Sequence, residues 1–266
     1  MQTQVMSKLL VRPRESDAEG CVVRVTPESA GWRYVGFEVY RLPGGAKLER
    51  LSAANETCIV ILSGRIHLRA GGEEWRNRGN RETVFDGPPS GLYVPPRVRW
   101  SVEAAGMSEI AVCTAPATDG AALRFLDAAE VRHESRGSGG EAREIDHILM
   151  EDVPAESLLV TEVVTPAGHW SSYPPHKHDV DDPPRETYLE ETYYHRVRPA
   201  GGFAFQRVYT GDRSIDESLA PGDGDVVLVP CGYHPVAAGA RHDSYYLNVM
   251  AGPTREWHVT VDPDFT

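Results

Sequence analysis

Short apolar runs of strand length recur along the whole chain, with turn residues between them. Several runs alternate apolar and polar residues, a period of two that predicts half-buried β-strands. The runs are Trp32–Tyr40, Thr57–Leu62, Leu158–Val164, Phe203–Tyr209, Asp225–Val229 and Ser244–Met250. No long segment has a clean 3.6-residue apolar stripe, and we expect one short helix within the Ala-rich stretch Ala117–Val131. The pattern therefore predicts an all-β protein.

A polar segment near the middle of the chain predicts two domains. Residues His133–Glu144 read HESRGSGGEARE, a composition typical of a linker. The flanking parts, residues 1–132 and 145–266, each have an ordinary domain size. We therefore expect two tandem barrels, divided at this segment.

The two halves also echo each other in sequence. LYVPPRVRWSV and VLVPCGYHPVA align when Pro95 is placed on Pro230, and Arg99 then falls on His234. A second echo pairs Glu56-Thr57 with Glu191-Thr192. These similarities predict a duplication in which only the second copy carries the histidines.

Composition and charge narrow the function classes. The 266-residue chain has a formal net charge of -12, which disfavours binding to nucleic acid or to anionic membranes. No apolar stretch approaches the roughly 20 residues of a membrane span, and the N-terminus has no signal-peptide pattern. The four cysteines form no C-x-x-C pair, so we expect reduced thiols and a cytoplasmic protein. An anionic substrate would then need local basic groups.

Histidines in the C-terminal half have the spacing of metal ligands. His176 and His178 are two residues apart, so on a strand both imidazoles face the same side. His234 follows a predicted strand, and Leu189–Tyr194 offers a carboxylate from Glu190 or Glu191. Three imidazoles and one carboxylate suit a borderline divalent ion, with Zn or Mn expected first and Fe or Ni as further options.

This order of residues resembles the cupin superfamily. Gly224, Pro230, Gly232 and His234 follow its second motif, with one residue instead of two between the last pair. Its first motif is stretched here, because Asp179–Glu190 separates His178 from Glu191. Glu191 is our choice of carboxylate because of the Glu56 echo. Glu190, the alternative, would face the opposite side of the strand.

The C-terminal half further resembles a bicupin isomerase family that includes 5-deoxy-glucuronate isomerase and 5-keto-4-deoxyuronate isomerase. The matching segments are Glu190–Tyr194, Gly202–Tyr209, Asp225–Pro230, Gly232–Val236 and Tyr245–Gly252. The resemblance implies two cupin (double-stranded β-helix, jelly-roll) barrels, a cytoplasmic enzyme, and His176, His178, Glu191 and His234 as metal ligands. It also implies interconversion of 5-deoxy-D-glucuronate and 5-dehydro-2-deoxy-D-gluconate in myo-inositol catabolism.

An aldose–ketose isomerisation needs a base that moves a proton through an enediol. Glu191, Glu190, Tyr193 and Tyr246 are our catalytic candidates, with no choice made among them. Binding of the sugar acid, including its carboxylate, is expected from Lys177, Arg196, Arg207 and Tyr245, although strand alternation points Lys177 away from the metal.

Two other functions use the same ligands: a metal-dependent cupin dioxygenase and a non-catalytic sugar-binding cupin. Oxygen consumption would distinguish the first, and ligand binding without turnover the second. Exposed strand edges and apolar runs also lead us to expect a homo-oligomer.

Overall fold

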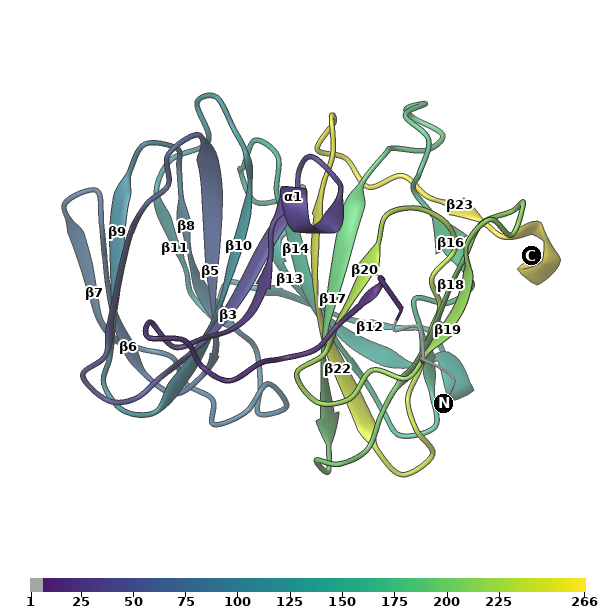
Figure 1. Ribbon diagram of the computed structural model, residues 1–266, viewed down its shortest axis with the longest axis horizontal. Helices are drawn as coiled ribbons and strands as arrows, with labels where there is room; N and C mark the ends of the chain where they lie inside the picture. Colours follow the sequence, from purple (N-terminus) through teal and green to yellow (C-terminus); the bar gives the residue numbers. More distant parts are fainter. Residues whose placement is uncertain (1–6) are drawn as a thin grey trace, which may run out of the picture.

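Two β-barrels lie side by side in the computed structural model, which describes residues 7–266 (Figure 1). Each barrel pairs a large sheet with a four-stranded sheet, and all the strand pairs in them are antiparallel. The predicted all-β, two-barrel architecture is therefore confirmed. No helix in the described part of the chain is long and apolar enough to cross a membrane.

The N-terminal barrel is formed by one six-stranded and one four-stranded sheet. The larger sheet has the order β11-β8-β5-β10-β3-β2 and the smaller one β4-β9-β6-β7. A one-turn helix, α1 (Pro27–Ala30), is capped by Thr26. The strands are β2 (Cys21–Val25), β3 (Gly36–Leu42), β4 (Lys47–Leu51), β5 (Asn55–Ser63), β6 (Ile66–Ala70), β7 (Glu73–Arg78), β8 (Ser90–Val94), β9 (Arg99–Ala104), β10 (Ser108–Pro116) and β11 (Arg124–Leu126).

The C-terminal barrel is formed by a seven-stranded sheet, β1-β20-β17-β22-β14-β13-β12, and a four-stranded sheet, β15-β21-β18-β19. A short pair, β16-β23, closes one end. Its elements are β1 (Leu10–Val11), β12 (Arg132–Arg136), η1 (Gly139–Glu141), β13 (Arg143–Leu149), β14 (Leu159–Thr165), β15 (Trp170–Ser171), β16 (His176–Lys177), β17 (Glu190–Arg198), β18 (Phe205–Tyr209), β19 (Asp216–Leu219), β20 (Val226–Val229), β21 (Val236–Ala237), β22 (Asp243–Ala251), β23 (Thr260–Val261) and η2 (Pro263–Phe265).

The first strand of the chain belongs to the second barrel. In β1, Leu10 pairs with Val227 and Val11 with Val226 of β20. Figure 1 shows the chain after β1 leaving the edge of the second barrel and crossing to the first. Residues 1–6, which our predicted N-terminal domain includes, lie outside the described residues.

Two local predictions are wrong. Residues 117–131 contain no helix; turns and the short strand β11 occupy this stretch, where Gly120 adopts a φ of 69°. Residues 133–144 are not an open linker, because β12 and β13 pair from Arg136↔Arg143 to Arg132↔His147 and make a hairpin. Its polar side chains bind one another across the two strands, which the composition alone did not reveal.

The two large sheets pack against each other, and the largest apolar cluster lies between the barrels. Alternation along β5 explains this arrangement: Cys58, Val60 and Leu62 face the other barrel, while Ile59 and Ile61 fill their own. Both faces of this strand are buried along its centre, so Cys58–Leu62 is an unbroken apolar run. The N-terminal barrel is filled by a second apolar cluster.

The register of the repeat differs by one residue from our second sequence echo. Thr57 pairs with Val94, just before Pro95, and Glu191 pairs with Val229, just before Pro230. Thr57 is therefore the counterpart of Glu191, and Glu56 the counterpart of Glu190. The Glu56 echo that led us to prefer Glu191 was misaligned.

Candidate metal centre

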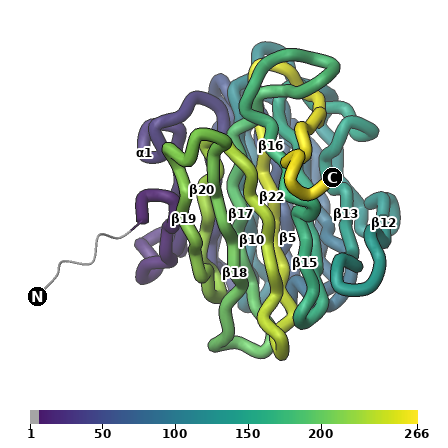
Figure 2. The backbone as a smooth tube through the Cα atoms, turned by 90° about the vertical axis from the view of Figure 1, so that its right-hand side faces the viewer, coloured from purple at the N-terminus to yellow at the C-terminus, as the bar shows by residue number. Residues whose placement is uncertain are grey.

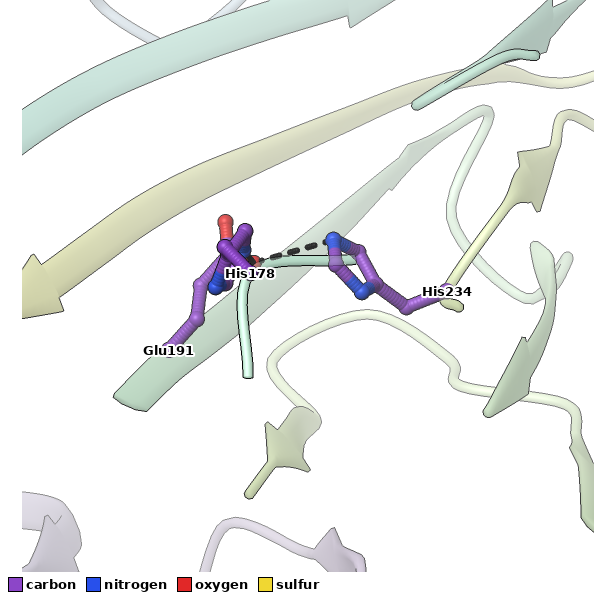
Figure 3. A group of neighbouring side chains, drawn as sticks. All are labelled: His178, Glu191 and His234. Carbon is purple, nitrogen blue, oxygen red and sulfur yellow. Dashed lines mark hydrogen bonds and ion pairs between the residues drawn. The ribbon is translucent and has the colours of Figure 1, made fainter. Parts of the chain in front are cut away.

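Three ligand-type side chains converge inside the C-terminal barrel: His178, which follows β16, Glu191 on β17, and His234, which precedes β21 (Figure 3). Their candidate ligand atoms all lie within 4.8 Å of one another, and all three residues are buried. Figure 3 shows His178 and Glu191 together, with His234 reaching toward them from another segment.

Glu191 is the centre of this group. Its Oε2 lies 3.1 Å from Nε2 of His178 and 3.2 Å from Nε2 of His234. Glu190, one residue earlier, faces the opposite side of β17 and accepts hydrogen bonds from backbone N–H groups of the other barrel. The geometry therefore selects Glu191 over Glu190 as the carboxylate of the group.

Backbone carbonyls fix the tautomer of each histidine. Nδ1 of His178 donates to the Leu189 carbonyl at 3.0 Å, and Nδ1 of His234 donates to the Gly232 carbonyl at 2.8 Å. A neutral imidazole that donates from Nδ1 presents a lone pair at Nε2, which is the form that ligates a metal. Within residues 7–266, Nε2 of His234 is buried and makes no hydrogen bond, although Oε2 of Glu191 lies 3.2 Å away, which suits a nitrogen placed to bind a cation.

The electrostatics of the group also suit a cation. Burial raises the pKa of Glu191 and, together with the neighbouring His178 and His176, keeps the pKa of His234 well below its usual value. Burial is the largest influence on His178 and opposes its charged form, but the hydrogen bond and the charge of Glu191, together with the backbone hydrogen bonds, outweigh burial, so the pKa of His178 rises. A divalent ion would offset the cost of burying the Glu191 carboxylate in the barrel.

His176 lies beside this group rather than within its tightest part. Its ring centroid is 5.0 Å from that of His234 and 5.9 Å from that of Trp257, and its Nδ1 donates to the Pro174 carbonyl. It has the same tautomer as the other two histidines. Burial is the main reason that the pKa of His176 falls to about 4, so this imidazole stays neutral at physiological pH.

A cavity opens onto the ligands from the interior of the barrel. Among our catalytic candidates, Glu191, Tyr193 and Tyr246 line it. The hydroxyl of Tyr193 hydrogen-bonds Ser172 at 3.2 Å, and the two tyrosine rings are 4.9 Å apart. The other lining residues are Arg136, Arg143, Ile145, His147, Met150, Thr161, Val163, Ser172, His176, Asn248, Met250 and Trp257.

Sequence reasoning missed the basic residues of this cavity. Arg136 and Arg143 come from β12 and β13, within the stretch that we predicted to be a linker. His147, on the same strand as Arg143, also lines the cavity. The alternation of Arg143, Ile145 and His147 along one strand was the signal that could have found them.

The basic residues that we predicted to bind the substrate point elsewhere. Lys177 faces away from the ligands, as strand alternation requires, and donates to Asp179 and Glu186. Because both of its partners are acidic and close, its ammonium group is already neutralised. The prediction that Lys177 binds the substrate is corrected by this geometry.

Arg196 and Arg207 also lie outside the cavity, because both occupy outward-facing positions of their strands. Arg196 binds Glu109 of the other barrel and Asp223, at the contact between the barrels. Arg207 forms a bidentate pair with Asp216 on the outer face of β18. Both arginines are therefore held in ion pairs away from the candidate metal centre.

Tyr245 is likewise buried between the barrels. Its hydroxyl donates to Glu162 at 2.8 Å, and the same carboxylate is held by Arg81 of the N-terminal barrel. Its neighbour Tyr246 points into the cavity, as alternation along β22 dictates. The prediction that Tyr245 binds the substrate is therefore not met.

The N-terminal barrel has no equivalent centre among its described residues. Thr57 stands at the position of Glu191, and Arg99, at the position of His234, is an exposed residue beside Glu49. The barrel interior is filled by apolar side chains instead.

Comparison with known proteins of similar sequence shows the family to which this chain belongs. The KduI/IolB family matches residues 9–266. The 5-deoxy-glucuronate isomerase of Geobacillus thermodenitrificans is 52% identical over 260 residues, which cover 97% of this chain and 95% of that protein. The chain belongs to the KduI/IolB family.

Solved structures agree with membership of the KduI/IolB family. An IolB-like protein from Salmonella typhimurium LT2 superposes with a TM-score of 0.94 at 43% identity, covering 97% of this chain and 98% of that chain. A mutant of Bacillus subtilis oxalate decarboxylase superposes with a TM-score of 0.65 at 13% identity, covering 96% and 80%. The second likeness shows the fold alone, and it confirms the predicted cupin architecture of this KduI/IolB protein.

Proposed function

We propose that this protein is an aldose–ketose isomerase that converts 5-deoxy-D-glucuronate to 5-dehydro-2-deoxy-D-gluconate in myo-inositol catabolism. Membership of the KduI/IolB family and the names of its relatives support this activity. The observation that carries the proposal is the buried His178–Glu191–His234 group, whose imidazole Nε2 atoms face one carboxylate oxygen at the wall of a cavity.

The residues that would hold a divalent ion are His176, His178, Glu191 and His234. The tautomers fixed by backbone carbonyls and the unpartnered Nε2 of His234 support this set. The donor chemistry fits Zn or Mn, with Fe or Ni as alternatives. The chemistry that such an ion supplies is Lewis acidity, which stabilises negative charge developing on the substrate's carbonyl and hydroxyl oxygens.

Proton transfer and hydrogen bonding to the substrate are carried out by side chains that line the cavity. The reaction removes a proton from C2 of the aldose and delivers one to C1, while the C1 carbonyl becomes a hydroxyl and the C2 hydroxyl a carbonyl. Burial raises the pKa of Tyr246 to about 12, so its hydroxyl stays protonated and donates hydrogen bonds to substrate oxygens. Tyr193 is placed beside it for the same role. Glu190 has no access to the cavity, so Glu191 is the carboxylate available for proton transfer.

Apolar side chains form part of the cavity wall. Met150, Val163 and Met250 line the cavity together with Trp257. Such walls restrict water, which strengthens each polar contact made by the substrate and protects an enediol from side reactions. We also infer a cytoplasmic location and a homo-oligomer, on the basis of the metabolic role and the exposed aromatic side chains Trp170, Phe203 and Phe205.

The test is turnover of 5-deoxy-glucuronate in D₂O, followed by proton NMR. We expect exchange of solvent deuterium into the C1 and C2 positions, loss of turnover after chelation, and recovery with Zn or Mn. The reaction should proceed equally without oxygen, whereas oxygen consumption would favour a dioxygenase. A metal-loaded protein that neither turns over nor exchanges would overturn the isomerase proposal and leave the fold intact.

A further inference from the structure

One cation in the cavity lacks an acidic partner. Arg143 is 8% exposed, and its guanidinium donates only to backbone carbonyls, from Nη1 to Glu141 at 3.0 Å and from Nη2 to Tyr173 at 3.1 Å. Within residues 7–266, no carboxylate lies within ion-pair distance of it. A guanidinium has five N–H donors, so several of its donors remain to bind a ligand.

The neighbouring arginine is different, because it is already neutralised. Arg136 forms a bidentate pair with Glu134, at 2.7 and 2.9 Å, and Glu134 also accepts from Nε2 of His147 at 3.0 Å. The pKa of Glu134 falls to about 2, chiefly because of Arg136, so this carboxylate stays charged and occupied. Burial lowers the pKa of Arg143. This direction is expected for a buried cation whose charge is not fully balanced by nearby carboxylates.

The position of Arg143 is fixed by the hairpin that carries it. A Cβ on Gly137 would lie 2.9 Å from Nη1 of Arg143, so the turn at Gly137, with a φ of 80°, closes directly over the guanidinium. Arg143 and His176 line the same cavity, so the guanidinium without an acidic partner and the candidate metal centre face one shared space.

Building on the proposed function, we propose that Arg143 binds the carboxylate of the sugar acid and makes this site selective for uronates over neutral aldoses. The anion would neutralise a buried cation that the fold leaves without a partner. A planar guanidinium matches a carboxylate with two parallel hydrogen bonds. With the carboxylate held at this wall, the other end of the sugar can reach the His178–Glu191–His234 group.

A purely structural role is the competing explanation, since Arg143 also ties the hairpin to the segment around Tyr173. The two explanations differ in substrate selectivity. A structural defect lowers the activity on every substrate alike, whereas loss of a carboxylate-binding group affects only substrates that carry the carboxylate. The comparison substrate is therefore 5-deoxyglucose, in which a hydroxymethyl group replaces the carboxylate.

The experiment measures kcat/KM of the metal-replete enzyme for 5-deoxy-glucuronate and for 5-deoxyglucose. Arg143→Gln should lower kcat/KM for the acid roughly 100-fold, mainly through KM, and leave the value for the neutral sugar unchanged. Arg143→Lys keeps the positive charge but loses the planar pair of N–H donors, so its kcat/KM for the acid should lie between those of the wild type and Arg143→Gln. Arg132→Gln is the matched control, because Arg132 lies on the same hairpin and pairs with Asp152 and Glu134 but does not line the cavity.

Calorimetric titration with D-glucuronate and with D-glucose gives a second readout that does not need turnover. We expect glucuronate to bind more tightly than glucose, and the difference to disappear in Arg143→Gln while metal content and thermal midpoint persist. An acid-to-neutral ratio that Arg143→Gln leaves unchanged would overturn the inference. Arg143-dependent binding without isomerisation would support the inference and overturn the proposed activity.

Discussion

Glu56 and Glu190 occupy equivalent positions in the two barrels, and each carboxylate accepts three backbone N–H bonds from the opposite barrel. Glu190 binds the amides of residues 33–35, and Glu56 binds those of residues 156–158. Each set of amides precedes the strand that leads into the contact between the barrels. The duplicated fold is thus held together by a reciprocal pair of carboxylates.

Replacing one of these carboxylates should loosen the contact between the barrels. Glu190→Gln keeps the shape but loses the charge that strengthens three hydrogen bonds, and we expect unfolding to become easier by about 2 kcal/mol. Urea denaturation monitored by circular dichroism measures this change. Exposed Glu256, replaced by Gln, is the control, and equal stability of both variants would contradict the role of Glu190.

The buried pair Arg81–Glu162 offers a second test of the contact. Arg81→Met leaves Glu162 buried with Tyr245 as its one remaining donor in the described part of the chain, and we expect the free energy of unfolding to fall by about 3–5 kcal/mol. Adding Glu162→Leu should restore most of this loss, because the stranded charge is then gone. Denaturation of both single variants and of the double variant measures the coupling, and strictly additive effects would argue against a stranded charge.

Removing a ligand should release the metal. In Glu191→Gln and in His234→Ala we expect the bound divalent ion to be lost, which plasma emission spectroscopy measures. Activity should fall as well, because the ion would stabilise the transition state by several kcal/mol. His67→Ala, in the N-terminal barrel, is the control. Metal retained in His234→Ala at the wild-type level would exclude His234 from the ligand set.

Metal binding should also stabilise the fold. A ligand that is present at 100 times its Kd and binds only the folded state adds about 2.7 kcal/mol of stability. We therefore expect the thermal midpoint of the wild-type protein to fall on chelation and to rise again with Zn or Mn. In Glu191→Gln the midpoint should respond to neither treatment, and a full response there would count against the proposed centre.

Stability should depend on pH through His195, which is fully buried and hydrogen-bonded to Gln206. Burial lowers the pKa of His195 from 6.5 to about 4. The unfolded chain therefore binds more protons, and stability falls as the pH drops from about 6.5 toward 4, by up to roughly 3 kcal/mol at about 1.36 kcal/mol per unit. Denaturation between pH 4 and 7 should show a smaller slope in His195→Gln; an unchanged slope would contradict this assignment.

Strand positions could be predicted because their patterns are local. The run Ser244–Met250 lies within β22, and Leu158–Val164 overlaps β14 almost completely. The group of His178, Glu191 and His234 could be predicted for the same reason, because the H-x-H pair and the turn that carries Pro230 and Gly232 are local patterns. The wrong register of Glu56 had no consequence, because Glu191 faces the histidines in any case.

The substrate-facing residues could not be predicted because they depend on which face of a strand is inside. Arg196 and Arg207 lie near ligand-bearing segments in sequence, yet alternation sends both outward to Asp223 and Asp216. Arg143 lies in a stretch whose glycines and charges look like a linker. Only the pairing of Arg136 with Arg143 turns that stretch into a cavity wall.

The placement of β1 ties the beginning of the chain to a strand made much later, since Leu10 pairs with Val227. In Figure 2 the N-terminal segment runs beside β19 and β20 at the edge of the second barrel. During synthesis, Leu10 and Val11 cannot form these pairs until β20 has been made. A C-terminal half expressed alone would therefore expose the unpaired edge of β20, which could pair with strands of other molecules and cause aggregation.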